Sequence, residues 1–256
     1  MGKMVEFVLH NGIDPRTGKL MGLRTGDPRE FTNIEQFKDA LKKQIIHAYD
    51  QIRIGYNLMQ SIHMNRYPVI FASMVTAGCV ESGKSVQQGG ARVSTCGMYV
   101  TGAANLADCI AAGDANFEGY ERLRQLLLNK PEKYGNDSPH VDGIYREMMH
   151  YVADEVQGWP DARGGHYAFG IDSQTMNIPH GEVTGALPDG RLAGEAFCDA
   201  SSPMMGRDIC GPTATVKSVA AIDQPDLQEG ALFNLRFDPK GVQGEGGRRI
   251  IEGVIR

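Results

Sequence analysis

The chain has 256 residues, of which 41% are hydrophobic and 22% charged, as is usual for a globular protein of one large or two small domains. Its net charge of −5 argues against a nucleic-acid partner, which would require a basic face, and no apolar run approaches the roughly 20 residues of a membrane span. The five cysteines are odd in number and irregularly spaced, which indicates free thiols in a reducing compartment. We therefore expect a cytoplasmic protein with neither a nucleic-acid nor a membrane partner.

The first predicted elements are a loop and a long helix. Residues 10–31 are punctuated by Gly, Pro and Asp and predict a loop. A capping box of Thr32 and Glu35 then starts a helix, which Pro68 ends. Apolar residues recur along this helix at three- and four-residue steps, so we expect them to face the core. This apolar stripe comprises Ile34, Phe37, Leu41, Ile45, Ala48, Ile52, Tyr56, Met59 and Ile62.

Strands and helices alternate after the long helix. Residues 69–77, VIFASMVTA, predict a buried strand, and residues 117–129 and 141–159 predict two amphipathic helices. From Arg163 onward short strands and loops are expected, with a last strand at 230–239 and the start of a helix after residue 243. The sequence therefore predicts a mixed α/β protein.

Residues 78–85, GCVESGKS, fit the phosphate-loop pattern G-x-x-x-x-G-K-[ST]. A phosphate loop needs a preceding strand and a helix that opens at the Lys-Ser pair, because the helix N-terminus holds the phosphates. The predicted strand at 69–77 is suitably placed, but the glycine pair Gly89-Gly90 follows too closely for a helix. A P-loop nucleotide-binding protein is therefore the less favoured hypothesis.

The same stretch places the Cys79 thiol two residues from the Glu81 carboxylate, and both are weak candidates for catalysis. A reactive cysteine needs a base, a cation or a helix N-terminus beside it, and only Lys84 is near in sequence. A cysteine after an apolar strand is more often a small buried hydrophobe. Glu81 could hydrogen-bond a polar substrate or lie at the surface beside Lys84, and both alternatives stay open.

Four segments in the same order resemble the glycyl radical enzyme family, the pyruvate formate-lyase-like group that includes glycerol dehydratase-like enzymes. They are NGIDP…LKKQ (11–44), CVESGK…CIAA (79–112), NFEGY…PHVD (116–142) and GEVTG…AAID (181–223). The resemblance implies an α/β fold, the second half of the pyruvate formate-lyase-type barrel with its surrounding helices. It also implies that residues 1–256 form a single partial domain of this kind.

The resemblance also implies the chemistry. Family members act on a small metabolite as lyases, dehydratases, decarboxylases or acyltransferases. Their glycyl radical is installed by an activating enzyme that uses S-adenosylmethionine and an iron–sulfur cluster, and we expect no cofactor bound in this chain itself. The parent enzyme is expected to be a homodimer.

Three departures from the family pattern accompany the resemblance. The family's catalytic cysteine lies upstream of the NGIDP segment, so Cys79 corresponds to a later barrel strand. The radical glycine lies in an R-V-x-G-Y motif that residues 1–256 do not contain. The family usually has a helix and a connecting loop where this chain has only residues 112–116. We therefore expect no glycyl radical domain and an inactive chain when it is alone. A non-catalytic remnant or partner-dependent subunit is the alternative function.

The substrate-binding candidates are Thr175, Met176 and Asn177. Residues 173–178 resemble the family strand that reaches the substrate cavity, although a plain core strand is the alternative. Residues 188–191, PDGR, predict a turn whose Arg191 either binds an anion or forms a structural ion pair. His166 and His180 lack metal-ligand spacing with Cys or with another His, so we expect no metal site.

Overall fold

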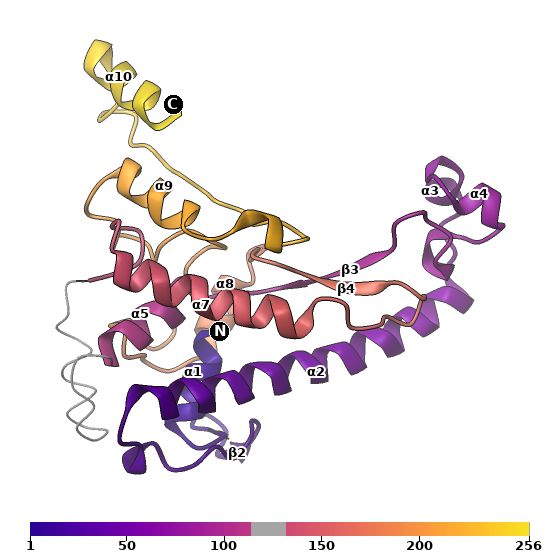
Figure 1. Cartoon of the computed structure of the whole chain (residues 1–256), viewed down its shortest axis with the longest axis horizontal. Helices are drawn as coiled ribbons and strands as arrows, with labels where there is room; N and C mark the ends of the chain where they lie inside the picture. Colours follow the sequence, from indigo (N-terminus) through magenta and orange to yellow (C-terminus); the bar gives the residue numbers. More distant parts are fainter. Residues whose placement is uncertain (114–131, 256) are drawn as a thin grey trace.

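A computed structural model describes residues 1–113 and 132–255 (Figure 1). The predicted helix at 117–129 and part of the short 112–116 segment lie outside these residues. Two parallel strands, β3 (Thr95–Tyr99) and β4 (His166–Gly170), pair in register from Thr95 opposite His166 to Tyr99 opposite Gly170. The connection between them contains α5 (Ala103–Gly113) and α7 (Pro139–Val156), as parallel strands require a long crossover.

The N-terminal part consists of one short helix, a small hairpin and the long helix α2 (Ile34–Arg66). Asn33 caps α2 by accepting a 3.0 Å hydrogen bond from the Gln36 backbone N–H, so the predicted Thr32–Glu35 capping box is wrong by one position. The elements before α2 are α1 (Gly2–Leu9), β1 (Ile13–Asp14), β2 (Lys19–Leu20) and a 3₁₀ turn, η1 (Pro28–Glu30).

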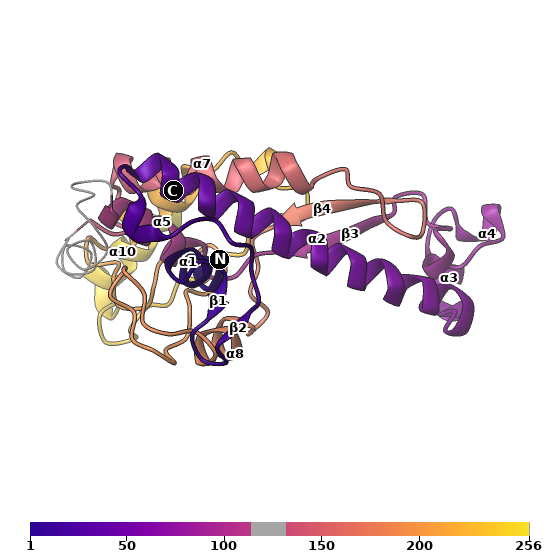
Figure 2. The same ribbon diagram turned by 90° about the horizontal axis from the view of Figure 1, so that it is seen from below.

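The apolar stripe of α2 is buried over only half of its length. Phe37, Leu41 and Ile45 pack in the core and are at most 4% exposed. Farther along the helix, Ile52 and Tyr56 are 44% and 40% exposed, and Met59 and Ile62 are similar. The expectation that the whole stripe faces the core is therefore wrong, because α2 extends beyond the elements that pack against its first half (Figures 1 and 2).

A small helical tip lies at the far end of α2, away from the body (Figures 1 and 2). It comprises α3 (Ile70–Val75), α4 (Cys79–Ser82) and the 3₁₀ turn η2 (Val86–Gln88). The predicted buried strand at 69–77 is thus wrong: the segment is mainly helical, and Phe71 is 78% exposed. A short apolar run has no periodicity that separates a strand from a helix.

The C-terminal part is mainly loops, with short helices between them. The predicted strand at 230–239 is wrong, because only Ala231 forms a bridge there, with Ile171. The predicted helices at 141–159 and after residue 243 are confirmed as α7 and α10 (Gly244–Ile255). The remaining elements are α8 (Asn177–Glu182), α9 (Pro212–Ala220) and a 3₁₀ turn, η3 (Gln224–Asp226).

The core lies where α7 packs against α5, β4 and the first half of α2. Met148, Met149 and Val152 of α7 are fully buried there, together with Phe169 of β4. Burial of a side chain of this size stabilises the fold by about 1.5–3 kcal/mol. Within the described ranges, each helix is too short or too polar to cross a bilayer.

Candidate functional site

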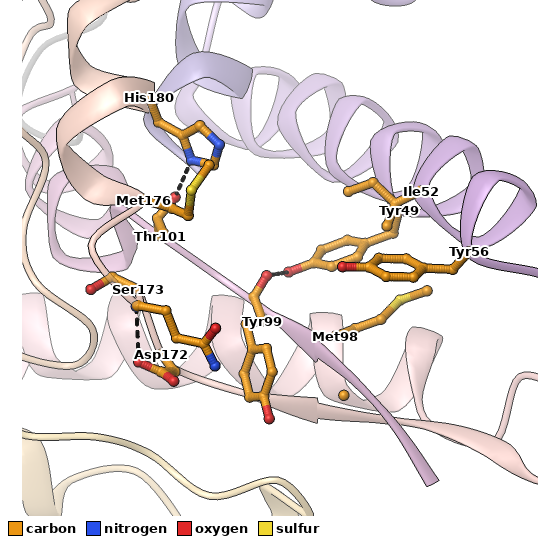
Figure 3. Close-up of a pocket in the computed structure, with 12 residues that line it drawn as sticks. Tyr49, Ile52, Tyr56, Met98, Tyr99, Thr101, Asp172, Ser173, Met176 and His180 are labelled. Carbon is orange, nitrogen blue, oxygen red and sulfur yellow. Dashed lines mark hydrogen bonds between the residues drawn. The ribbon is translucent and has the colours of Figure 1, made fainter. Parts of the chain in front are cut away.

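A cavity of about 320 Å³ lies at the carboxyl ends of β3 and β4 (Figure 3). Ligands of parallel α/β sheets commonly bind at this edge, where the loops that follow the strands converge. Three parts of the chain contribute: the middle of α2, the end of β3, and the segment from the end of β4 into α8. The lining residues are Tyr49, Ile52, Tyr56, Gly97, Met98, Tyr99, Thr101, Asp172, Ser173, Gln174, Met176 and His180.

Two tyrosines connect α2 to β3 at the cavity wall. The Tyr49 hydroxyl donates to the Tyr99 backbone carbonyl at 3.3 Å, and the Tyr99 hydroxyl donates to Glu229 at 3.2 Å. Partial burial, followed by the nearby charges of Glu229 and Asp172, raises the pKa of Tyr99. Tyr99 is therefore a neutral donor at physiological pH, held with its ring at the cavity.

The loop after β4 is held in an uncommon backbone conformation. Gln174 and Thr175 have φ values of 43° and 68°, in the left-handed region that residues other than glycine seldom adopt. The Asp172 carboxylate accepts a 3.1 Å bond from the Gln174 N–H, and the buried Ser173 hydroxyl donates to Asp199. These bonds stabilise the strained loop, and such strain often accompanies a functional site.

His180 of α8 closes another side of the cavity. Its Nδ1 lies 2.9 Å from the Thr101 hydroxyl oxygen. Partial burial lowers the pKa of His180 below its ordinary value. The imidazole is therefore neutral at pH 7, and in this state it has one nitrogen to donate and one to accept.

The predicted substrate-binding residues do not lie on a strand. Residues 173–176 form a turn, and Asn177 begins α8. Met176 lines the cavity, whereas Thr175 and Asn177 are not among its lining residues. Asn177 instead donates its side-chain amide to the Phe197 carbonyl at 3.3 Å. The strand assignment for 173–178 is therefore wrong, because the left-handed turn ends the extended backbone after Ile171.

Neither Cys79 nor Glu81 lines the cavity. Cys79 is buried, 3% exposed, at the start of α4 rather than on a barrel strand. Glu81 is exposed and accepts a 3.0 Å bond from the Gly78 N–H, which caps the same short helix. The geometry fits the structural alternatives for both residues.

The GKS stretch does not have the geometry of a phosphate loop. A helix precedes it in place of a strand, and Ser85 is followed only by the three-residue turn η2. The glycine pair has a packing role instead: a Cβ on Gly89 would lie 2.2 Å from the Arg163 carbonyl oxygen, and one on Gly90 would lie 2.1 Å from that of Lys84. The backbone approaches too closely for a larger residue at either position.

The PDGR turn is confirmed, but both alternatives for Arg191 are wrong. Gly190 donates its N–H to the Leu187 carbonyl, and Asp189 accepts from the Arg191 N–H. The Arg191 guanidinium is buried and forms neither an anion site nor an ion pair among the described residues. It donates to backbone carbonyls, among them Gly181 at 2.8 Å and Gly185 at 3.0 Å, at the end of α8.

One group of side chains among the described residues has spacing that suits a metal ion. His150, Asp223 and Asp226 place their ligand atoms within 4.8 Å of one another. The two aspartates are exposed and contact different nitrogens of the histidine ring, at 3.5 and 3.2 Å. Exposed acidic groups are often found together in this way without a bound ion. His166 and His180 are not part of it.

Several cavity residues were not singled out by sequence. Tyr49, Tyr99, Thr101 and Asp172 come together only through the fold. The sequence did offer one signal for these residues of the cavity wall. The apolar stripe of α2 continues to Ile52 and Tyr56, which the core leaves exposed.

Comparison with known families identifies the class of protein to which this cavity belongs. The family described as pyruvate formate lyase-like matches residues 1–113 and 111–181, and the family described as glycine radical matches residues 197–256. The chain therefore belongs to the pyruvate formate lyase-like glycyl radical enzymes, as its resemblance indicated. The expectation that the glycyl radical domain is absent is contradicted by the second match.

Particular relatives are dehydratases and lyases. The chain is 36% identical to trans-4-hydroxy-L-proline dehydratase of Clostridioides difficile and 29% identical to (2S)-3-sulfopropanediol dehydratase of Klebsiella oxytoca. These alignments cover 99% and 96% of the chain but 34% and 33% of the relatives, so the chain spans about a third of their length.

Solved structures confirm the fold. The glycerol-bound form of the B12-independent glycerol dehydratase of Clostridium butyricum superposes with a TM-score of 0.91 at 30% identity. Hydroxyproline dehydratase of Clostridioides difficile, with its substrate bound, also gives 0.91 at 35% identity. Each comparison covers 100% of this chain and 34% or 35% of the other chain.

Proposed function

We propose that the protein carrying this chain is a glycyl radical lyase or dehydratase that acts on a small hydroxylated metabolite. The observation that carries this proposal is the cavity at the carboxyl ends of β3 and β4, in a chain that matches both families of the enzyme class. Its volume of about 320 Å³ suits a small molecule, and it combines apolar walls with a few polar groups.

The names of the relatives support this substrate class. The first two act on trans-4-hydroxy-L-proline and on a sulfopropanediol, and the glycerol dehydratase binds glycerol, so hydroxylated compounds recur. The glycyl radical would supply hydrogen-atom abstraction when it is present in the active enzyme. The residues of this chain would bind and orient the substrate and exclude water from it.

Met176 is the substrate-binding residue that the geometry supports best. It lines the cavity and is 45% exposed, so a ligand has direct access to it. Thr175 and Asn177 would act through the backbone, since the left-handed φ of Thr175 and the bond from Asn177 to Phe197 hold Met176 at the wall. The partners we propose are an S-adenosylmethionine-dependent iron–sulfur activating enzyme and a second copy of the protein, in the cytoplasm.

The decisive experiment treats the full-length protein with such an activating enzyme under anaerobic conditions. A glycyl-type doublet in the electron spin resonance spectrum, with release of water from a panel of small diols and hydroxylated amino acids, is the expected result. Met176→Ala is expected to raise KM several-fold, whereas Met205→Ala, at an 88% exposed position, is the matched control. The 256-residue chain alone is expected to show neither radical nor turnover. A full-length protein that forms no radical would overturn the proposal.

One observation favours the alternative of a partner-dependent subunit. Apolar side chains on the tip are strongly exposed, among them Ile70 at 67%, Phe71 at 78% and Val75 at 73%. Surfaces of this kind usually contact another polypeptide. Size-exclusion chromatography that shows a compact, non-associating chain at micromolar concentration would count against this alternative.

A further inference from the structure

The charged groups around the cavity are predominantly negative. Asp172 is the carboxylate that lines it, and none of the described lining residues is a lysine or an arginine. One oxygen of Asp172 accepts the Gln174 N–H, whereas Oδ2 has no hydrogen-bond partner among the described residues. The carboxylate therefore has an acceptor position free for a ligand.

A second carboxylate reinforces this potential. Glu229 accepts the Tyr99 hydroxyl at 3.2 Å, and Asp172 also lies near enough to Tyr99 to affect its titration. His180 does not offset these charges, because burial keeps its imidazole neutral at pH 7. An anionic ligand group would meet repulsion at this end of the cavity, whereas a cationic group would be attracted.

Aromatic rings complete the site. Figure 3 shows Tyr49 and Tyr56 on the α2 side, Asp172 on the side of the loop after β4, and Tyr99 between them in this view. The face of a tyrosine ring attracts ammonium groups, and such rings beside a carboxylate are a recurrent way to bind amines in proteins.

We propose that this cavity binds a small molecule that carries a protonated amine. The inference rests on the proposed function, since it names the substrate class of the same cavity. Asp172 would form a charge-assisted hydrogen bond with the ammonium group, and Tyr56 and Tyr99 would contact it through their rings. The Thr101–His180 pair would form hydrogen bonds with the neutral hydroxyl of the substrate.

The test compares 1-amino-2-propanol with 1,2-propanediol, two molecules of nearly equal size that differ by an amine in place of a hydroxyl. Binding to the full-length resting protein is measured by isothermal titration calorimetry at pH 7.5, where an alkyl amine is protonated. The amine is expected to bind about tenfold more tightly than the diol, or better, because a hydrogen bond to a charged group contributes at least that much binding free energy. Raising the salt concentration should reduce this preference.

Variants assign the preference to the cavity. Asp172→Asn should weaken binding of the amine about 10- to 100-fold and leave binding of the diol nearly unchanged. Asp154→Asn, which removes an exposed carboxylate of α7 outside the cavity, is the matched control and should change neither. Tyr56→Leu should weaken binding of the amine about two- to fivefold, whereas Tyr56→Phe keeps the ring and should not.

The outcomes separate this inference from the proposed function. Equal affinity for the two probes, or a preference that survives in Asp172→Asn, overturns the amine assignment even if the activated protein forms its radical. A clear amine preference that depends on Asp172 supports the assignment even if no radical forms. In that case only the proposed enzymatic function fails, because binding and radical formation are measured independently.

Discussion

Replacing Arg191 should destabilise the protein through the loss of hydrogen bonds to the backbone. The side chain is 1% exposed, and its guanidinium donates to the carbonyls of Gly181, Thr184, Gly185 and Leu192 at distances from 2.7 to 3.5 Å. It also lies 4.5 Å from the centre of the Phe197 ring. These contacts fasten the end of α8, the helix that carries His180 of the cavity.

The magnitude follows from what each substitution leaves unpaired. Arg191→Met has a similar length but no donor, so the buried carbonyls of Gly181 and Thr184 lose a partner, at about 1–3 kcal/mol each, and the partly buried carbonyls of Gly185 and Leu192 lose one at a smaller cost. Because the methionine does not need to be desolvated as a cation, part of that cost is recovered. We expect a net loss of about 3–5 kcal/mol. Arg191→Lys keeps the charge but not the planar fork, and should lose about 2 kcal/mol.

Urea unfolding followed by circular dichroism measures these losses at constant m-value. The midpoint temperature of thermal unfolding, Tm, should fall by roughly 10 °C for Arg191→Met in a chain of this size. Arg24→Met, at an exposed arginine, is the control and should remain within about 0.5 kcal/mol of the parent. If Arg191→Met costs less than about 1 kcal/mol, the assignment of Arg191 as the residue that holds the end of α8 is incorrect.

Three other predictions concern different parts of the fold. Burial raises the pKa of Asp108 to about 7, above the ordinary 3.8. The contribution of this group to the free energy of unfolding should therefore be largest below pH 4 and should fall by up to about 4 kcal/mol as the pH rises through 7. Asp108→Asn should remove this contribution in pH-dependent urea titrations, and a variant whose pH profile matches that of the parent would contradict it. Gly89→Ala should cost about 2–4 kcal/mol in unfolding experiments, because a Cβ would clash with the Arg163 carbonyl, whereas Gly83→Ala has a similar positive φ in open space and should cost about 1 kcal/mol. Equal losses would show that the clash is relieved at no cost. Isothermal titration calorimetry should detect no binding of Mg·ATP at the GKS stretch, since this stretch lacks the strand–loop–helix arrangement of a phosphate loop. Binding of ATP that is lost in Lys84→Ala would revive the P-loop alternative.

Helices with many turns could be predicted because their signal is repeated. α2 and α7 contain four or more turns, and the apolar spacing along each identified them with boundaries correct to within three residues. Short segments carry no such redundancy. VIFASMV at 69–75 is as apolar as a buried strand, but it forms an exposed helix at the tip, and in the part of the chain that the structure describes neither sheet includes it.

The candidate site was only partly visible in the sequence. Met176 was predicted and lines the cavity, but the strand expected to carry it is a left-handed turn. Asp172 was not singled out, because an aspartate after a strand is usually a solvated loop residue. Its position beside Tyr99 depends on the pairing of β3 with β4 and on the loops that follow them.

The sequence by itself determined the family and the long helices. Ordered motifs and a 3.6-residue period are properties of the chain that hold whatever packs against it. The tertiary structure alone decided which half of the α2 stripe is buried and that Arg191 binds carbonyls. It also decided that tyrosines from α2 and β3 meet a carboxylate from the loop after β4. These outcomes depend on distances between residues far apart in the chain, and local propensity contains no information about such distances.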